Sequence, residues 1–511
     1  MRTTVINQFD ETVRRYSEEI AIVEEGVKVT FLQLGSMAMK IKKEVLSKGT
    51  VKNKIIAVLL PKSKEIVATD LAVLAAGAVF MNIDCKLPQE RIKAIVEHVC
   101  PDRIVTNTEL FKKFSEAFQG CEVFCLGADY LGGELLGWKS ETDSLIDTDP
   151  FCIINTSGST GIPKAVVLNQ RSFMDFIDWS DEVYQFGNRE RLGCLTPVYF
   201  DIYVFELCLL LSRGATMVLL DARYSTFPVE LIRKLQEERI SFIFWVPTIM
   251  VIIANADLLN GVSLPELKRV WFAGEVFPMK PFLYWYDHLK ETQFSNLYGP
   301  IEITLDCTYY IVEKRLNEQE LLPIGYPCRN TDILILNDND ERCKVMEKGE
   351  LCVRGSSLAM GYYNDLERTQ QVFVQNPLNK SYPELIYRTG DIVYQREDGE
   401  IMFVGRKDSL IKHSGYRIEL TEIEHLLVNK CKLVKNCCAV YPKAKKEIVL
   451  YYEAAEEVER ATFYRELGKL VPKYMIPKYF IKRDTLPQNA NGKINRLQLE
   501  EEAEKAVRRM G

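Results

Sequence analysis

The sequence predicts an α/β protein. We expect a large N-terminal domain with layered, mostly parallel sheets and a small β-rich subdomain, followed by a small, mobile α+β C-terminal domain. Short apolar runs typical of buried strands alternate with helical patterns through residues 1–400, as in parallel sheets joined by helices. The first such unit has a strand over 55–60, a helix near 64–76 and a strand over 79–83. Further strands are expected over 242–246 and 270–273.

The pattern changes towards the C-terminus. Residues 310–405 contain short strand-like segments separated by Gly, Asn and Asp turns, and they are the predicted β-rich part of a large domain that spans 1–405. The chain breaks again near 405–408. Beyond it, a helical pattern over 420–430 and strands near 436–441 and 448–453 predict a small mixed domain over 410–511.

Composition excludes several classes of protein. The 511 residues carry a net charge of −6, so the chain shows no overall footprint for nucleic acid. Residues 411–511 are nevertheless net basic and the preceding body is net acidic, which suits an acidic partner or reflects only solvated helix faces.

The cysteines and the N-terminus indicate a cytoplasmic protein. Fourteen cysteines and four histidines show no metal-ligand spacing, and no apolar signal region begins the chain. We therefore expect reduced, mostly buried thiols. The apolar stretch 66–83 contains Asp70 and predicts a buried helix and strand rather than a membrane span.

The most informative stretch is 155–164, Asn-Thr-Ser-Gly-Ser-Thr-Gly-Ile-Pro-Lys, which lies between two strand-like runs. Its glycines let the backbone approach an anion, its hydroxyl and amide groups donate hydrogen bonds, and Lys164 adds a positive charge. These features predict a phosphate-binding loop, although the spacing of Gly158, Gly161 and Lys164 is not that of Walker A. A mobile polar surface loop is the alternative at this point.

Three further short motifs carry chemistry. The segment 296–302 offers an aromatic ring, a tight turn and a carboxylate, which suit base stacking and Mg²⁺ binding. The segment 387–391 is expected to end a strand with Asp391, a group suited to ribose hydroxyls. The segment 489–494 places Lys493 after a polar turn. Each motif alone is more often ordinary loop chemistry.

Together and in this order, the motifs resemble those of the adenylate-forming superfamily. Within it, the chain is similar to the amino-acid adenylation domains of nonribosomal peptide synthetases and to the stand-alone D-alanine–carrier protein ligases. The resemblance runs from residue 30 to residue 496, and 272–278 looks closer to the D-alanine ligases. The other matching segments are 77–84, 200–206, 349–351, 405–408, 415–420 and 474–477.

The resemblance implies two half-reactions. A carboxylate attacks the α-phosphate of ATP to give an acyl-adenylate and pyrophosphate, and the phosphopantetheine thiol of a carrier protein then takes the acyl group as a thioester. Fixed cations and N–H donors would stabilise the charge on the α-phosphoryl oxygens. Lys493 would bridge the substrate carboxylate and the α-phosphate. Asp408, within 406–409, would be the hinge of the C-terminal domain, and Gly415 would line the pantetheine channel.

The same resemblance assigns the nucleotide contacts. Tyr298 would stack on adenine, Asn296 would bond the adenine amino group, and Asp391 would bind the ribose. Glu302 would hold Mg²⁺, and Lys164 with its loop would contact the β- and γ-phosphates. The assigned nucleotide-binding residues are Thr156, Ser157, Gly158, Ser159, Thr160, Gly161, Gly274, Glu275, Asn296, Tyr298, Gly299, Asp391 and Arg406.

Asp201 determines the expected substrate class. In amino-acid-activating members the aspartate of this motif pairs with the substrate α-ammonium group, whereas the plain structural alternative is a cap on the following helix. The predicted side-chain pocket consists of Ile202, Phe205, Phe244, Trp271, Ala273, Leu297, Leu305 and Asp306. Its three large aromatic rings leave room for a small side chain, and its one carboxylate needs a partner. Serine, alanine and glycine are the leading candidates.

Some positions and alternatives remain open. Ile301 replaces the usual threonine, so a hydroxyl worth about 1 kcal/mol to ATP binding is missing. No carrier segment follows residue 496, so we expect a separate carrier protein unless the chain is excised from a longer synthetase. An acyl- or aryl-CoA ligase that uses free CoA is one alternative, which Asp201 argues against. A non-catalytic relative is the other, which the retained lysines and carboxylates argue against.

Overall fold

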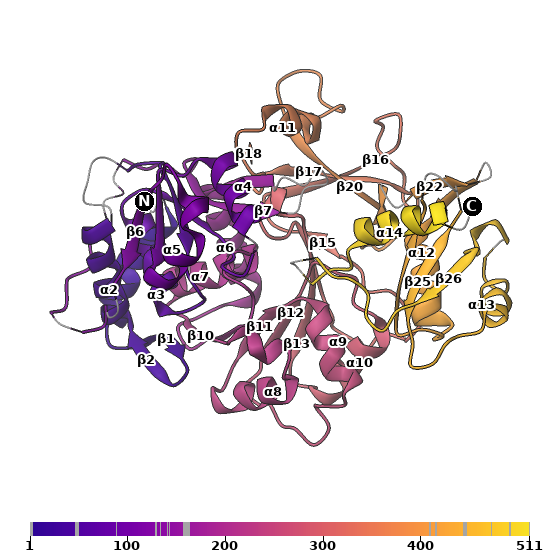
Figure 1. Ribbon diagram of the computed structural model, residues 1–511, viewed down its shortest axis with the longest axis horizontal. Coiled ribbons are helices and arrows are strands. Elements are labelled where there is room, and N and C mark those ends of the chain that lie inside the picture. Colours follow the sequence, from indigo (N-terminus) through magenta and orange to yellow (C-terminus); the bar gives the residue numbers. More distant parts are fainter. Residues whose placement is uncertain are drawn as a thin grey trace.

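The computed structural model describes residues 4–45, 51–87, 89–127, 130–132, 134–140, 142, 144–156, 164–407, 410–413, 416–442, 447–471, 473–489 and 492–509. It has the layered α/β architecture expected from the sequence. A large body carries the first three sheets, and a smaller C-terminal lobe, yellow in Figure 1, lies at one end of it.

The largest sheet (sheet A) has a parallel centre and antiparallel edges. Its strand order is β15 (Tyr326–Pro327), β14 (Thr308–Ile311), β13 (Gln293–Tyr298), β12 (Arg269–Phe272), β11 (Phe242–Trp245), β9 (Arg191–Cys194), β10 (Thr216–Leu219), β1 (Ile20–Glu24) and β2 (Val27–Thr30). The run from β13 to β1 is parallel, so the carboxyl ends of β9, β11, β12 and β13 meet at one edge.

The second sheet (sheet B) holds the strands on both sides of the predicted phosphate loop. Its order is β18 (Gly361–Tyr362), β8 (Lys164–Asn169), β7 (Pro150–Thr156), β4 (Val79–Asn82), β3 (Ile55–Leu59), β5 (Arg103–Asn107) and β6 (Glu122–Leu126). β7 and β8 pair antiparallel, with Thr156 opposite Lys164. The loop therefore joins the two ends of a hairpin.

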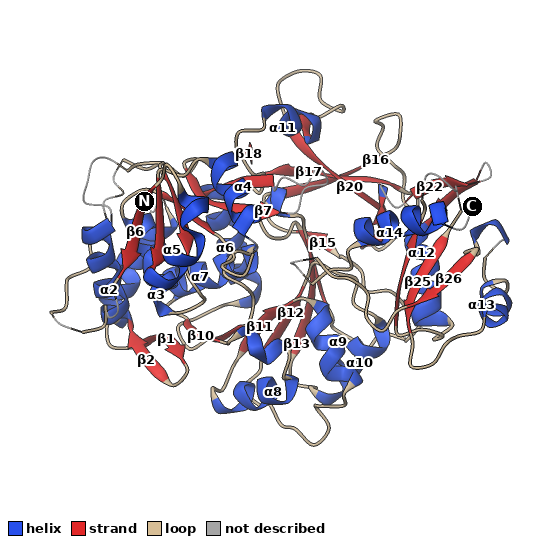
Figure 2. Ribbon diagram, in the orientation of Figure 1, coloured by secondary structure: helices blue, strands red, loops and turns tan. Residues whose placement is uncertain are grey.

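Helices pack in three layers around these two sheets (Figure 2). The shared inner layer consists of α1 (Val5–Tyr16), α2 (Phe31–Val45), α3 (Lys64–Ala75), α6 (Gln170–Tyr184) and α7 (Asp201–Arg213). The outer face of sheet A packs on η2 (Ala222–Ser225), α8 (Pro228–Glu237), α9 (Pro247–Asn255) and α10 (Met279–His288). The outer face of sheet B packs on α4 (Gln89–Val99), α5 (Thr108–Phe114) and η1 (Ser115–Phe118).

The strand period explains why the core divides in this way. In β11, Phe242 and Phe244 join the inner core, whereas Ile243 and Trp245 join the outer one. Successive side chains on a strand point to opposite faces, so a strand that is buried on both sides is apolar throughout. The expected helix and strand over 66–83 correspond to α3 and β4, and none of the described helices meets the length and hydropathy needed to cross a membrane.

The third sheet is smaller and β-rich. It contains β16 (Thr331–Leu336), β17 (Gly349–Gly355), β20 (Leu385–Gln395), β19 (Phe373–Gln375) and β21 (Ile401–Arg406), and α11 (Leu366–Val372) lies beside it. The expectation that Asp391 ends a strand is wrong. β20 has 11 residues and continues past Asp391, because β21 pairs with it and places Arg406 opposite Asp391.

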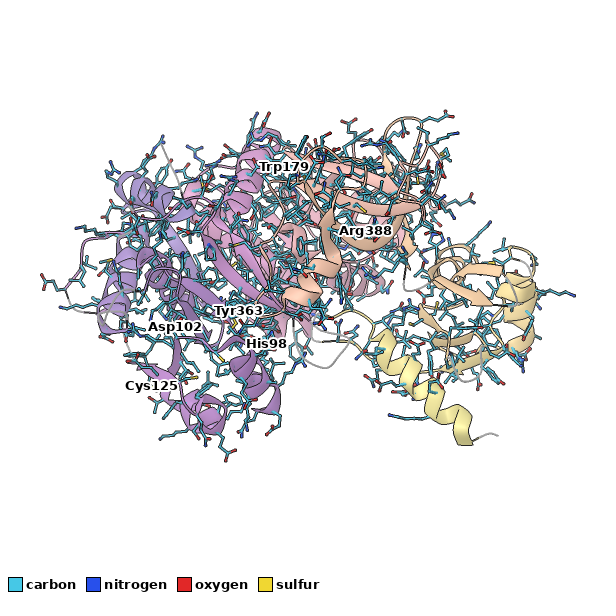
Figure 3. The ribbon with its side chains drawn as sticks, turned by 90° about the horizontal axis from the view of Figure 1, so that it is seen from above. His98, Asp102, Cys125, Trp179, Tyr363 and Arg388 are labelled. Atoms are coloured by element: carbon cyan, nitrogen blue, oxygen red, sulfur yellow. The ribbon has the colours of Figure 1, made fainter. Side chains whose placement is uncertain are left out.

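The C-terminal lobe is an α+β unit, seen from above in Figure 3. Its elements are β22 (Leu410–His413), β23 (Tyr416–Glu419), α12 (Leu420–His425), a π-helical turn η5 (Leu426–Lys430), β24 (Asn436–Val440), β25 (Val449–Glu453), α13 (Arg460–Leu467), η6 (Lys473–Met475), β26 (Tyr479–Lys482) and α14 (Arg496–Arg509). The single helix expected over 420–430 therefore changes from α to π geometry. An ion pair between Lys432 and Glu318 joins the lobe to the body.

Candidate functional site

The candidate site lies where the parallel strands of sheet A end. Gly274 and Glu275 follow β12, Tyr298 is the last residue of β13, and Asp201 begins α7 after β9. In open α/β sheets this edge, beyond the carboxyl ends of the strands, is where ligands bind. The register of the sheet therefore brings together residues that are far apart in the sequence.

Lys493 reaches this edge from the C-terminal lobe. Its N–H donates to Asn489 Oδ1 at 3.0 Å, and its carbonyl accepts from the Asn489 N–H at 2.7 Å, which closes the predicted polar turn. A Cβ atom built on Gly274 would lie 3.8 Å from Lys493 Cε and 3.9 Å from Nζ. The lysine thus packs against Gly274. Burial raises the pKa of the Asp201 and Glu275 carboxyls, and the charge of Lys493 acts against that rise in both.

Asp201 is a half-buried carboxyl close to that cation. Burial raises its pKa to about 6, against the lowering effects of the Ile202 N–H, which donates to Oδ1 at 2.9 Å, and of Lys493. The helix-cap alternative does not fit, because Phe200 is the N-cap residue and Asp201 accepts from the Ile202 N–H, the next amide along the chain. The carboxylate is therefore available for a cationic group.

Asp306 is a second buried carboxyl, and the charge of Asp201 acts on it. It is 3% exposed, and burial together with the charge of Asp201 raises its pKa well above the usual range. No residue in the described ranges donates a hydrogen bond to it. A buried carboxyl without a protein donor calls for a ligand that supplies one.

The activity of such a site should depend on pH through Asp201. Its raised pKa means that the negative charge is present above about pH 6 and is lost as the pH falls through that value. If Asp201 pairs with a substrate ammonium, kcat/KM for the amino acid in ATP–pyrophosphate exchange should fall about tenfold per pH unit below that value. An Asp201→Asn variant should lack this acid limb. A parent profile that stays flat from pH 7 to pH 5 would contradict the pairing.

The three large aromatics of the predicted pocket wall contact one another. Phe205 and Trp271 stack with ring centroids 5.4 Å apart, Phe244 meets Trp271 edge-on at 5.5 Å, and all three are 0% exposed. Trp179 of α6, labelled in Figure 3, contacts Trp271 with ring centroids 6.1 Å apart. The remaining wall residues Ile202, Ala273, Leu297 and Leu305 are also buried. The wall is thus filled with rings, which favours a small ligand.

The chain beside Asp306 has an unusual backbone. Thr304 and Leu305 adopt φ angles of 58° and 67°, which are uncommon for residues with a Cβ atom. A Cβ atom on Gly299 would lie 2.4 Å from the Leu305 carbonyl oxygen and 2.5 Å from Asp306 Cα. Only glycine at 299 allows this close approach, and the strained turn fixes Asp306 beside the end of β13.

Tyr298, Asp391 and Arg406 form a hydrogen-bonded group at the same edge. The Tyr298 hydroxyl donates to Asp391 Oδ2, and Arg406 donates to Asp391 Oδ1 at 2.9 Å. Asn296 is buried beside them, and its amide nitrogen donates to the Pro323 carbonyl at 2.8 Å, so its amide oxygen is directed elsewhere. An aromatic ring, a carboxylate and an amide oxygen provide the contacts predicted for a nucleoside.

The Tyr298 hydroxyl should matter for nucleotide binding. A Tyr298→Phe variant keeps the ring but removes a hydrogen bond to a charged group, which is worth about 1.5–3 kcal/mol. We expect the KM for ATP to rise about tenfold, with little change in the KM for the carboxylate substrate. Initial-rate measurements with each substrate varied in turn test this. An unchanged KM for ATP would mean that Tyr298 does not orient Asp391 for the ribose.

Glu302 and Lys164 are joined through a tyrosine that the sequence did not single out. The Tyr362 hydroxyl donates to Glu302 Oε1 at 2.6 Å, and Lys164 Nζ lies 5.4 Å from the Tyr362 ring centroid. No group of three or more His, Cys, Asp or Glu side chains suited to a metal occurs within the described ranges. One carboxylate fits Mg²⁺, which retains waters and takes substrate phosphate oxygens as its other ligands.

Several predicted residues lie outside the described ranges. They are Ser157, Gly158, Ser159, Thr160, Gly161, Asp408 and Gly415. Thr156 and Lys164 mark the two ends of the predicted phosphate loop, and Glu275 accepts hydrogen bonds from the Thr248 N–H and hydroxyl at 3.0 and 2.6 Å. The sequence motifs contained no signal for Thr248 or Tyr362, which reach the site through α9 and β18.

The layered fold and this group of residues define the class of protein, which is an adenylate-forming enzyme. The chain belongs to the family of AMP-binding enzymes, whose family model matches residues 9–363.

Known proteins similar to this chain agree with that membership. The chain is 32% identical over 500 residues to gramicidin S synthase 2 of Brevibacillus brevis, a match that covers 98% of this chain but only 11% of that protein. It is 27% identical over 508 residues to zwittermicin A synthase ZmaJ of Bacillus cereus, covering 97% and 94% of the two chains. The solved structure of O-succinylbenzoate coenzyme A synthetase from Bacillus subtilis, in complex with AMP, has a TM-score of 0.82 at 20% identity, covers 98% of each chain and supports the fold.

Proposed function

We propose that the protein activates a small amino acid as its aminoacyl-adenylate and transfers it to the phosphopantetheine thiol of a carrier protein. The observation that carries this proposal is the half-buried Asp201 carboxyl at the edge of sheet A, on which the charge of Lys493 acts. A carboxylate there matches an α-ammonium group, and a lysine beside it matches a carboxylate and a phosphate.

The first half-reaction follows from that placement. A carboxylate oxygen of the amino acid attacks the α-phosphorus of ATP, the bond to the β-phosphate oxygen breaks, and pyrophosphate leaves. Lys493 neutralises the charge on the attacking carboxylate and on the α-phosphoryl oxygens. Mg²⁺, held by Glu302, would neutralise the leaving phosphates. Lys164 and the loop from Thr156 would hold the β- and γ-phosphates, while Tyr298 and Asp391 would hold the adenosine.

The pocket wall supports a small substrate. The mutual packing of Phe205, Phe244 and Trp271 fills the volume that a long side chain would need. Asp306 without a protein donor favours a side chain that carries one, such as the serine hydroxyl, while alanine and glycine also fit by size. An exchange panel in which large aromatic or long basic amino acids outperform these three would refute this choice.

The second half-reaction requires the C-terminal lobe to move. We place the hinge at Asp408, within 406–409, between a large domain that spans 1–405 and a small domain over 410–511. Turning about it would remove Lys493 from the site, and Gly415 would then line the pantetheine channel. The net basic C-terminal domain suits an acidic carrier protein.

An acyl- or aryl-CoA ligase is the second candidate, because one structural neighbour is named as a coenzyme A synthetase. A transfer assay separates the two. The enzyme is incubated with ATP, Mg²⁺ and its amino acid, and thioester formation is compared between free CoA and a phosphopantetheine-loaded carrier protein. Transfer to the carrier at the higher rate supports the proposal, and efficient transfer to CoA alone contradicts it.

A further inference from the structure

A half-buried lysine binds the segment that leads to the candidate site, and it lies outside every motif identified in the sequence. Lys62, between β3 of sheet B and α3, donates to the carbonyls of Cys194, Leu195 and Thr196 at 2.9, 2.8 and 3.2 Å. These carbonyls belong to the end of β9 in sheet A and to the segment that follows it. Three acceptors use all three N–H donors of an ammonium group, so the geometry requires the charged form of Lys62.

Glu206 is the acidic group whose charge acts on Lys62. It lies on α7, is 0% exposed, and its carboxyl is close to the Cys194 thiol, in a residue whose carbonyl Lys62 binds. Burial raises the pKa of Glu206 and lowers that of Lys62, and the charge of each opposes the shift of the other. Among the described residues no ion pair or hydrogen bond joins Lys62 to Glu206, and the two act on each other through their charges.

The segment held by Lys62 leads directly to Asp201. Residues 194–200 connect β9 to α7, whose first residue is Asp201 and which also carries Glu206. The Thr196 hydroxyl donates to the carbonyl of the wall residue Phe244 at 3.4 Å. Farther along, the Asn82 amide donates to the Val198 carbonyl at 3.2 Å. The segment is thus tied to both sheets before it reaches the site.

We propose, resting on the function proposed above, that Lys62 and Glu206 are positioning residues for Asp201. Lys62 fixes the start of the segment through its three carbonyls, and Glu206, on the helix that follows, compensates the charge of Lys62. Together they hold the ammonium-binding carboxylate at a constant place relative to sheet B and its phosphate-loop hairpin. Neither residue touches the substrate.

This role can be separated from a purely structural one. Removing one member of a buried ion pair leaves an uncompensated charge and destabilises the fold, whereas replacing both by apolar side chains is often neutral for stability. The carbonyls of residues 194–196 lose their donor in both cases. Stability should therefore recover in the double variant, while the position of Asp201 should not.

The test compares Lys62→Met, Lys62→Arg and the double variant Lys62→Met/Glu206→Leu with the parent. Lys64→Met is the matched control, because Lys64 is a neighbouring lysine whose ion pairs go to Glu24 and Glu65 instead. For each protein, the thermal midpoint, the KM for the amino acid and the KM for ATP are measured by pyrophosphate exchange. Hydrogen exchange of the amides over 194–206 is followed in parallel.

We expect the double variant to recover the thermal midpoint yet keep a KM for the amino acid at least about tenfold above the parent value, with an unchanged KM for ATP. Lys62→Arg should recover part of the loss, and amides over 194–206 should exchange faster in Lys62→Met but not in Lys64→Met. A double variant with parental KM and parental exchange overturns the proposal, as does an equal rise in both KM values. If the parent activates no amino acid, the proposed function fails, and hydrogen exchange over 194–206 still decides whether Lys62 holds the segment.

Discussion

Replacing Lys493 with alanine should lower the rate of amino-acid-dependent ATP–pyrophosphate exchange by about 10²- to 10³-fold, the effect of removing one preorganised group that stabilises transition-state charge. Lys493 packs against Gly274, and its charge reaches both Asp201 and Glu275. No other lysine or arginine is assigned to the same place in the site. The loss should therefore appear in kcat more than in either KM.

The control for this variant is Lys473→Ala in the same lobe, since Lys473 is exposed and is not assigned to the site. It should retain parental exchange and a parental thermal midpoint. Lys493→Ala should also keep the thermal midpoint, because its side chain makes no ion pair recorded within the described ranges. Exchange by Lys493→Ala at the parental rate would show that the lysine has no part in adenylation.

Replacing Asp201 with asparagine should raise the KM for the amino acid by about 10²-fold, close to the 3 kcal/mol expected when one member of a desolvated charge pair is removed. Asparagine keeps the shape of the side chain and an acceptor for the Ile202 N–H, so folding should be little affected. The KM for ATP should change far less, because Asp201 is not assigned to the nucleotide.

The matched control uses a substrate analogue that lacks the α-amine. The parent enzyme should discriminate strongly against the des-amino acid, and Asp201→Asn should discriminate weakly. If asparagine at position 201 leaves the preference for the amine intact, the ammonium group is bound elsewhere. Comparing the change in the enzyme with the change in the substrate isolates the interaction between Asp201 and the substrate amine, as a double-mutant cycle does.

Local sequence patterns predicted the main layers of the fold. They also predicted many of the residues that lie at the carboxyl edge of sheet A. The continuous apolar runs over 55–60 and 242–246 predicted buried strands, and the structure contains them as β3 and β11. Asp201 and Asp306, separated by more than 100 residues, were predicted to share a pocket, and their electrostatic coupling shows that they are close. The roles of these residues stay predictions.

Long-range pairing explains what local patterns missed. Asp391 was expected to end a strand, yet it lies within β20 after Gly390, which has a φ of 71°, because β21 continues the pairing past both residues. Tyr362 enters the site only because a two-residue strand adds to the edge of β8. Lys62 lies in an ordinary polar loop. Its hydrogen bond to the end of β9 depends on how sheets A and B pack together, which no local sequence pattern predicts.

The most direct measurement is ATP–pyrophosphate exchange, with Mg²⁺, across all the proteinogenic amino acids and D-alanine. Selective exchange with serine, alanine or glycine is the predicted result, and it would establish amino-acid activation and a small pocket together. Selective exchange with a large aromatic or long basic amino acid would establish activation but contradict the assigned wall. Exchange with none of them would contradict amino-acid activation itself.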